Sequence, residues 1–223
     1  MVARGVGQGD SYGGYRARLV AELQAKGIRD LAVLQAVAQV PRHLFVPDSV
    51  RHRAYEDSAL PIAAGQTISQ PWVQARSLEL ARLNGREKVL EVGTGSGYQT
   101  ALLSLVAGGV FSVERIAQLA LEARAALDLA GIRGASVMVG DGTLGWRPYA
   151  PYDAILVSAA SPQPPQPLLD QLSEGGRLII PLGDREVQRL TVIRRTADGF
   201  ERETQSDVRF VPLIGQFGFE GSA

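Results

Sequence analysis

The chain has 223 residues, which is enough for one substantial hydrophobic core. Hydrophobic residues make up 45% and charged residues 21%, as in ordinary globular domains, and 23 Lys and Arg residues balance 23 Asp and Glu residues. The neutral balance argues against a nucleic-acid partner, and the absence of cysteine excludes disulfides, thiolate nucleophiles and cysteine-based zinc sites.

The pattern of the chain predicts neither a membrane segment nor a metal site. Residues 1–14 are rich in glycine and polar residues, lack the apolar core of a signal peptide, and are expected to be a flexible lead-in. No run of about 18 apolar residues is present. Only His43 and His52 are available as histidine ligands, so no metal is expected. We expect a cytoplasmic monomer that forms a single domain over residues 1–223, without membrane contacts.

Residues 15–85 are expected to form a mainly helical segment on the substrate side of the domain. Apolar residues at helical spacing predict helices at residues 15–26, 30–39 and 71–83. Gly27 would end the first helix, Asp30 would cap the second, and Pro71 would stand in the first turn of the third. Residues 41–69 lack periodicity and predict an irregular connector that forms a wall for the substrate.

Strands and helices alternate from residue 86 to residue 214. The expected strands are residues 88–92, 110–113, 136–139, 154–157 and 177–181, and the expected helices are residues 98–106, 116–130 and 167–172. Alternation of this kind predicts an α/β fold with a doubly wound, mostly parallel sheet and helices on both faces. Three further β segments, at residues 190–194, 200–204 and 208–213, predict an antiparallel edge at the C-terminal end.

The strongest local signal is a glycine-rich turn after the first of these strands. It reads Glu91-Val92-Gly93-Thr94-Gly95-Ser96-Gly97-Tyr98. Glycines allow positive φ and let a ligand approach backbone N–H groups, at the carboxyl end of a strand where open α/β sheets bind ligands. A dinucleotide fingerprint needs a glycine where Tyr98 stands, which disfavours a dehydrogenase. The pattern Glu-x-Gly-x-Gly-x-Gly is instead similar to the first motif of class I methyltransferases.

Two acidic residues follow the next two strands. Glu114 stands at the tip of the second strand, where a carboxylate can accept hydrogen bonds from both hydroxyls of a ribose. Asp141 and Gly142 end the third strand, where the carboxylate would reach an adenine amino group and the glycine would let the loop pass the ring. Each has a simpler interpretation, since strand ends often carry a solvated charge and Asp-Gly is often only a turn.

The segment Gly65-Gln66-Thr67-Ile68-Ser69-Gln70-Pro71 resembles the diagnostic segment of the protein-L-isoaspartate(D-aspartate) O-methyltransferase family. Further similarity lies at residues 41–47, 54–62, 151–160, 172–183 and 208–213, so that the resemblance spans about residues 15 to 214. It implies a Rossmann-like class I methyltransferase with S-adenosyl-L-methionine as methyl donor and S-adenosyl-L-homocysteine as product. Ala63-Ala64 departs from the family, in which a glycine-bearing dipeptide is commoner before Gly65.

By resemblance, Ser69 supplies the active-site hydroxyl, although it could also cap the helix that begins at Pro71. The residues expected to contact the cofactor are Gln66, Thr67, Ile68, Gly93, Thr94, Gly95, Ser96, Glu114, Asp141 and Gly142. Residues 214–223 match the family poorly, and no role is assigned to them.

The function implied by the resemblance is transfer of a methyl group to the free α-carboxyl of L-isoaspartyl residues, with D-aspartyl as a second candidate acceptor. The ester then closes to a succinimide, which starts repair of the damaged protein. The expected partners are isoaspartyl-containing proteins and peptides, without nucleic acid. The main alternative is a methyltransferase with a different small-molecule acceptor. Nucleic-acid amino-methylating enzymes carry Asn/Asp-Pro-Pro-aromatic where this chain reads Ser158-Ala159-Ala160-Ser161, which counts against them.

Overall fold

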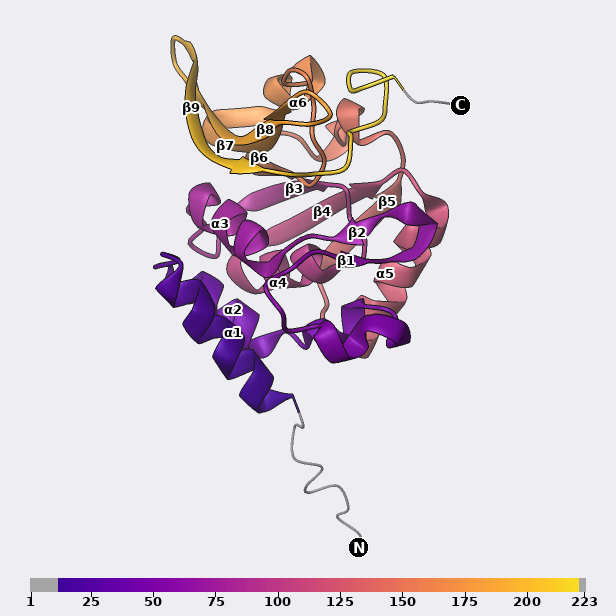
Figure 1. The fold of residues 1–223 in the computed structure, drawn as a ribbon. Helices are drawn as coiled ribbons and strands as arrows, with labels where there is room; N and C mark the ends of the chain where they lie inside the picture. Colours follow the sequence, from indigo (N-terminus) through magenta and orange to yellow (C-terminus); the bar gives the residue numbers. More distant parts are fainter. Residues whose placement is uncertain (1–11, 221–223) are drawn as a thin grey trace, which may run out of the picture.

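The computed structural model describes residues 12–220 (Figure 1). The expected flexible lead-in falls mainly on residues 1–11, which lie outside the described part of the chain. Its last two residues are already helical, because the first helix begins at Gly13 rather than Tyr15. Within residues 12–220, no helix combines the length and the apolar character needed to span a membrane.

Seven strands of the described chain form one mixed sheet in the order β5-β4-β3-β6-β7-β8-β9. They are β3 (Lys88–Val92), β4 (Gly109–Glu114), β5 (Ala135–Val139), β6 (Tyr152–Val157), β7 (Leu172–Gly183), β8 (Gln188–Thr196) and β9 (Gly199–Val208). Strands β5, β4, β3, β6 and β7 are parallel, and β8 and β9 are antiparallel, which confirms the predicted antiparallel edge.

Helices cover the two faces of the sheet unequally. The α-helices of the described residues are α1 (Gly13–Ala25), α2 (Leu31–Gln39), α3 (Pro71–Ala81), α4 (Tyr98–Val106), α5 (Ala117–Leu129) and α6 (Gln166–Asp170). Helices α3, α4 and α5 pack on one face, and α1 and α2 form an outer layer against them (Figure 1). The short α6 and the 3-10 turns η4 (Gly142–Leu144) and η5 (Arg147–Tyr149) cover the other face.

The central strands β3 and β6 are buried on both faces of the sheet, so they are apolar almost throughout, whereas the edge strand β9 is largely exposed and polar. Alternate residues of β6 point to opposite sides. Leu156 joins the larger apolar cluster under α1–α5, and Ile155 joins the smaller cluster on the α6 side. This double burial explains why the central strands read as short continuous hydrophobic runs in the sequence.

Three sequence expectations are wrong in detail. The helix expected at residues 167–172 is α6 (Gln166–Asp170), and Leu172 already begins β7, which is therefore longer than the expected strand 177–181. Residues 208–213 are not a strand: β9 ends at Val208, and beyond it the N–H of Phe210 donates to the side chain of Gln188 on β8, while Pro212 forms an isolated bridge with Ala160. The third helix ends at Ala81 rather than near residue 83, because Arg82 takes a left-handed conformation with φ 51°. Such a residue stops the helical hydrogen-bond pattern.

Residues 41–69 are irregular, as expected, but well packed. They contain the 3-10 turns η1 (Arg42–Phe45), η2 (Asp48–Arg53) and η3 (Ala63–Gly65), together with the antiparallel pair β1 (Leu60–Pro61) and β2 (Thr67–Ile68). In η3, Ala64 has φ 55°, a conformation that glycine adopts more readily. This position is where the sequence departs from the glycine-bearing family pattern.

Candidate active site

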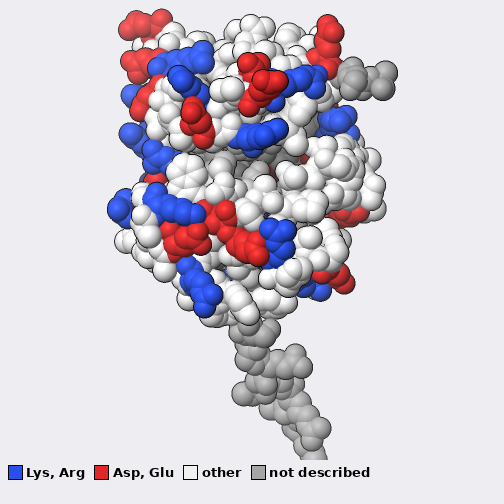
Figure 2. Space-filling model, in the orientation of Figure 1, with Lys and Arg blue, Asp and Glu red and all other residues white. Residues whose placement is uncertain are grey.

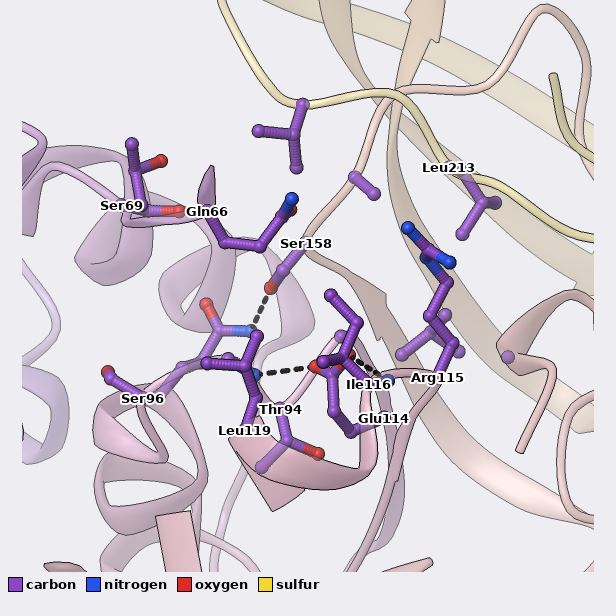
Figure 3. Close-up of a pocket in the computed structure, with 18 of the residues that line it drawn as sticks. Gln66, Ser69, Thr94, Ser96, Glu114, Arg115, Ile116, Leu119, Ser158 and Leu213 are labelled. Carbon is purple, nitrogen blue, oxygen red and sulfur yellow. Dashed lines mark hydrogen bonds between the residues drawn. The ribbon is translucent and has the colours of Figure 1, made fainter. Parts of the chain in front are cut away.

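A cavity opens at the carboxyl ends of β3, β4 and β6 (Figure 3). The strand order reverses between β3 and β6, and this is where open α/β sheets bind ligands. The space between protein atoms, including the part open to solvent, is about 750 Å³. The wall is formed by residues 66–69, 92–96, 113–116, 158–159 and 211–214, with Gln74, Gln99, Leu119 and Gly142.

The glycine loop forms the floor of this cavity through its backbone. Gly93 and Gly95 have φ of 93° and 53°, a region that residues with a Cβ rarely adopt. A Cβ on Gly93 would also lie 3.4 Å from the Cβ of Ser158 on the neighbouring strand end. The loop therefore presents peptide groups to a ligand without side chains in the way.

Glu114 is held rigidly at the end of β4. Its Oε2 accepts a hydrogen bond from the N–H of Gly95 (2.9 Å), and its Oε1 accepts one from the N–H of Ile116 (2.9 Å). A carboxylate oxygen can accept more than one hydrogen bond, so both oxygens keep acceptor capacity toward the cavity. This arrangement suits a pair of ribose hydroxyls.

Behind the loop lies a buried polar network that the sequence did not indicate. The hydroxyl of Thr94 hydrogen bonds that of Ser112 (2.6 Å), so this side chain points away from the cavity. Ser112 and Thr100 both donate to Oε2 of the fully buried Glu91. Burial raises the pKa of Glu91 to about 7. The network fixes the loop from below, while the backbone of Thr94 lines the cavity.

Residues 66–69 form the opposite wall, and Figure 3 shows Gln66 and Ser69 across the cavity from Arg115 and Leu213. The β1–β2 pairing holds this segment, with Ile68 buried as its anchor. The hydroxyl of Ser69 makes no hydrogen bond to any described residue. Ser69 is not the helix cap: the cap position of α3 is Gln70, and the N–H of Trp72 is accepted by Asp57 (2.8 Å). The Ser69 hydroxyl is thus available to a ligand.

Asp141 and the C-terminal segment meet beside the cavity rather than inside it. The Oδ1 of Asp141 accepts from the N–H and hydroxyl of Thr143, and its Oδ2 accepts from the N–H of Gln216 (2.8 Å). Asp141 does not line the cavity, whereas Gly142 does. The segment that follows β9 does line the cavity, through residues 211–214. It is held there by the N–H of Leu213, which donates to the carbonyl of Ala160 (2.7 Å).

A second hollow adjoins the cavity on the side of α3. It shares Thr67, Ser69, Ser158 and Val211 with the cavity and is otherwise lined by Ala59, Gln70, Trp72, Val73 and residues 207–210. Figure 2 shows a hollow across the middle of this face, with charges of both signs above and below it and mostly uncharged atoms around it. The cavity therefore has an open side large enough for part of a polypeptide.

Comparison with known proteins identifies the family. The sequence model of the protein-L-isoaspartate(D-aspartate) O-methyltransferase family matches residues 15–218. A protein-L-isoaspartate O-methyltransferase from Methanoculleus marisnigri is 52% identical over 90% of this chain and 91% of its own length. One from Dictyoglomus thermophilum is 48% identical over 92% and 93%. The chain belongs to this family. Its activity is methyl transfer from S-adenosylmethionine to the carboxyl group of isoaspartyl residues in damaged proteins.

Solved structures agree with this assignment to the isoaspartyl methyltransferases. One protein-L-isoaspartate O-methyltransferase superposes with a TM-score of 0.83 at 28% identity, covering 91% of this chain and 67% of the other. A putative Plasmodium falciparum member in complex with S-adenosyl-L-homocysteine gives a TM-score of 0.78 at 26% identity, covering 90% and 98%. The cofactor is S-adenosylmethionine, and the fixed acceptor oxygens of Glu114 and the bare glycine loop fit its ribose and amino-acid portions.

The structure brings most of the expected cofactor residues of this methyltransferase together. The expected residues on the cavity wall are Gln66, Thr67, Ile68, Ser69, Gly93, Thr94, Gly95, Ser96, Glu114 and Gly142. Lining residues that were not predicted from the sequence are Gln74, Val92, Gln99, Val113, Arg115, Ile116, Leu119, Ser158, Ala159 and residues 211–214. Ser158 directly follows β6, so its position at a strand end predicts a place in the site, as it does for Glu114. Nothing local marks residues 211–214, because their position depends on how the chain returns after β9.

Proposed function

We propose that this cavity is the methyl-transfer site, with S-adenosylmethionine against the glycine loop and Glu114 and the acceptor carboxylate entering beside Ser69. The observation that carries the proposal is the hydroxyl of Ser69, which has no hydrogen-bond partner among the described residues and lies on the wall shared by the cavity and the adjoining hollow. A group at this boundary can touch both the donor and the acceptor.

The chemistry requires positioning more than acid–base catalysis. When bound, S-adenosylmethionine supplies a methyl group already activated by a positive sulfonium. A carboxylate is ionised at neutral pH, so its oxygen can attack without a base: the new O–CH₃ bond forms as the S–CH₃ bond breaks, and that electron pair stays on sulfur. The residues around the cavity need only align the carboxylate and exclude water. A chain with two histidines and no cysteine can therefore carry out this reaction.

The substrate side is formed by the segment of residues 15–85, in one domain with the cofactor-binding core of residues 86–214. The hollow beside Ser69 is bounded by Trp72 and Val73 of α3 and by residues 207–210, which include the end of the edge strand β9. Its open shape suits an extended peptide whose isoaspartyl residue enters the cavity. We propose isoaspartyl-containing proteins and peptides as partners, D-aspartyl as a second acceptor, and action as a cytoplasmic monomer without nucleic acid.

The first experiment is a transfer assay with labelled S-adenosylmethionine and three peptides that differ only in containing isoaspartate, D-aspartate or normal aspartate. Base-labile methyl ester on the isoaspartyl peptide, and none on the normal one, is the expected result. Transfer to neither damaged peptide, with cofactor still bound, would contradict the proposal. Sedimentation or light scattering of the same sample gives the oligomeric state.

Replacing Ser69 tests its role directly. Ser69→Ala is expected to lower kcat by about 10-fold or more, because the acceptor loses a group that orients it. The matched control is Ser104→Ala in α4, outside the cavity, where the hydroxyl donates to the carbonyl of Thr100. Turnover of Ser69→Ala within about twofold of wild type would remove Ser69 from the mechanism, since orientation effects at a reacting centre are larger than that.

A further inference from the structure

Arg42 is a fully buried cation behind the wall of the cavity. Its Nη1 donates to Oε1 of Gln74 (2.9 Å), its Nη2 donates to the carbonyl of Ser69 (2.9 Å), and its guanidinium lies 4.6 Å from the ring centre of Tyr98. Among the described residues no carboxylate forms a direct ion pair with Arg42, although Asp57 acts on it from a greater distance, and burial lowers the pKa of Arg42 to about 10. Burying a charge without a carboxylate in direct contact costs several kcal/mol, so stability alone explains this residue poorly.

The contact with Arg42 fixes which way the amide of Gln74 points. An arginine can only donate hydrogen bonds, so the oxygen of the amide must face Arg42 and the nitrogen must face away. No described residue accepts a hydrogen bond from this nitrogen, and Gln74, although buried, lines the cavity. The two N–H groups of Gln74 are therefore left for a ligand.

The second contact of Arg42 fixes Ser69. The carbonyl of Ser69 is held by the guanidinium while its hydroxyl has no partner among the described residues. Gln74 and Ser69 are close in sequence. The backbone N–H of Gln74 donates to the carbonyl of Gln70 in the first turn of α3, which holds the two residues near each other. One rigid guanidinium thus sets the orientation of two hydrogen-bonding groups on the same wall.

We propose that Arg42 is a positioning residue that holds the Gln74 amide and the Ser69 hydroxyl together as a donor pair for a carboxylate in the cavity. This inference rests on the proposed function of the cavity. Two carboxylates enter there, the amino-acid carboxylate of the methyl donor and the α-carboxylate of the isoaspartyl acceptor. Gln74 lines the cavity and not the adjoining hollow, which places its N–H groups on the donor side.

The decisive variant is Gln74→Glu. A glutamate at this position gains an ion pair with Arg42, so the variant is expected to fold and to melt no lower than wild type. It also replaces two N–H donors by a negatively charged oxygen that repels a carboxylate ligand. The expected result is an increase of about 10-fold or more in one Michaelis constant, as for the loss of a charged hydrogen bond. A purely structural role for Arg42 and Gln74 predicts unchanged kinetics.

The two sources of the carboxylate are separated by titrating each substrate. A raised KM for S-adenosylmethionine, with weaker binding of S-adenosylhomocysteine in calorimetry, assigns the donor's carboxylate. A raised KM for the isoaspartyl peptide alone assigns the acceptor. The control is Gln205→Glu, because Gln205 also accepts from an arginine, Arg76 (3.0 Å), but lies outside the cavity, where the new carboxylate would face the exposed Glu203 in place of the present hydrogen bond (2.6 Å). It is expected to leave both constants within about twofold.

Arg42→Lys provides a second, independent test. Lysine keeps the charge but cannot hold two acceptors in a fixed fork, so kcat/KM is expected to fall about 10-fold with a normal circular dichroism spectrum. Arg177→Lys is the control, since Arg177 also donates to a backbone carbonyl, that of Ala81, away from the cavity. Wild-type kinetics for either Gln74→Glu or Arg42→Lys would overturn the inference. Failure of the wild-type enzyme to methylate any isoaspartyl peptide would instead refute the proposed function, while the calorimetric comparison would still test Gln74.

Discussion

Glu91 is a carboxylic acid enclosed directly behind the glycine loop, where its Oε2 accepts hydrogen bonds from Thr100 and Ser112 and its Oε1 has no hydrogen-bond partner within residues 12–220. Burial raises its pKa from 4.5 to about 7 in the folded chain. The folded state therefore keeps a proton that the unfolded state loses at lower pH. Between these two pKa values stability falls as pH rises, and above about pH 7 the loss is complete.

Glu91→Gln is expected to abolish this contribution, because the amide is neutral at every pH and can keep an oxygen toward Thr100 and Ser112. The free energy of unfolding of the variant, relative to wild type, should increase by about 2–3 kcal/mol between pH 5 and pH 8. Urea denaturation of both proteins across this range measures the difference. A constant difference at all pH values would show that Glu91 is ionised in the folded enzyme.

The residues of the site differ in whether the sequence around them predicts their role. Gly93, Gly95 and Glu114 could be predicted because their roles follow from position: each stands at the end of a strand whose apolar run is visible in the sequence. Ser69 was found only through resemblance to a family. Arg42 gave no local signal, since a buried arginine is recognised only from the groups that enclose it.

At the scale of elements, α3 shows how a distant residue completes a helix. The expected start at Pro71 is confirmed, but the cap comes from Asp57, whose Oδ1 accepts from the N–H of Trp72 and whose Oδ2 accepts from Gln70 (3.0 Å) and Lys26 (2.6 Å). Sequence patterns place caps beside the helix they serve, so a cap supplied by a residue in another segment was not predictable. By contrast, Asp30 caps α2 as expected, because it adjoins the helix.

Asp57→Ala should destabilise the folded chain by removing the cap of α3. The carboxylate is almost completely buried, and its removal leaves the first turn of α3 without its acceptor, at a cost of about 1–2 kcal/mol in the free energy of unfolding. Chemical denaturation measures this loss. In the control Asp48→Ala, an exposed carboxylate that pairs with Arg51 is removed, and a change below about 0.5 kcal/mol is expected. Equal effects of the two substitutions would show that Asp57 is not the cap.

For the molecule as a whole, the alternation of strands and helices was sufficient to predict the parallel sheet and its antiparallel edge. The return of residues 209–218 across the cavity was not predictable, because it depends on contacts between ends of the chain that are far apart in sequence. Residues 214–218 received no role from the sequence, yet the family match extends through them and Ile214 lines the cavity. The cavity is closed only when the N-terminal segment, the sheet and this C-terminal segment are all in place.

Cofactor binding should therefore stabilise the whole chain, and the C-terminal segment should contribute to the effect. S-adenosylhomocysteine at about 100 times its Kd adds about 2.7 kcal/mol, which corresponds to a rise in Tm of roughly 5–10 °C for a chain of this size. Asp141→Ala removes the acceptor that holds Gln216 and should reduce this rise by several degrees. Thermal denaturation with and without ligand measures both values.

A truncation after Gly215 separates the two roles that Asp141 can have. It removes Gln216, whose N–H donates to Asp141, but leaves the carboxylate itself and the cavity-lining residues 211–214 in place. If Asp141 acts by anchoring the C-terminal segment, the truncated chain should lose as much of the ligand-induced rise in Tm as Asp141→Ala does. If Asp141 contacts the adenine directly, as the resemblance implies, the truncated chain should keep the full rise, because the released carboxylate is then more accessible to the ligand. The bonds from Asp141 to Thr143 and Gln216 favour the anchoring role.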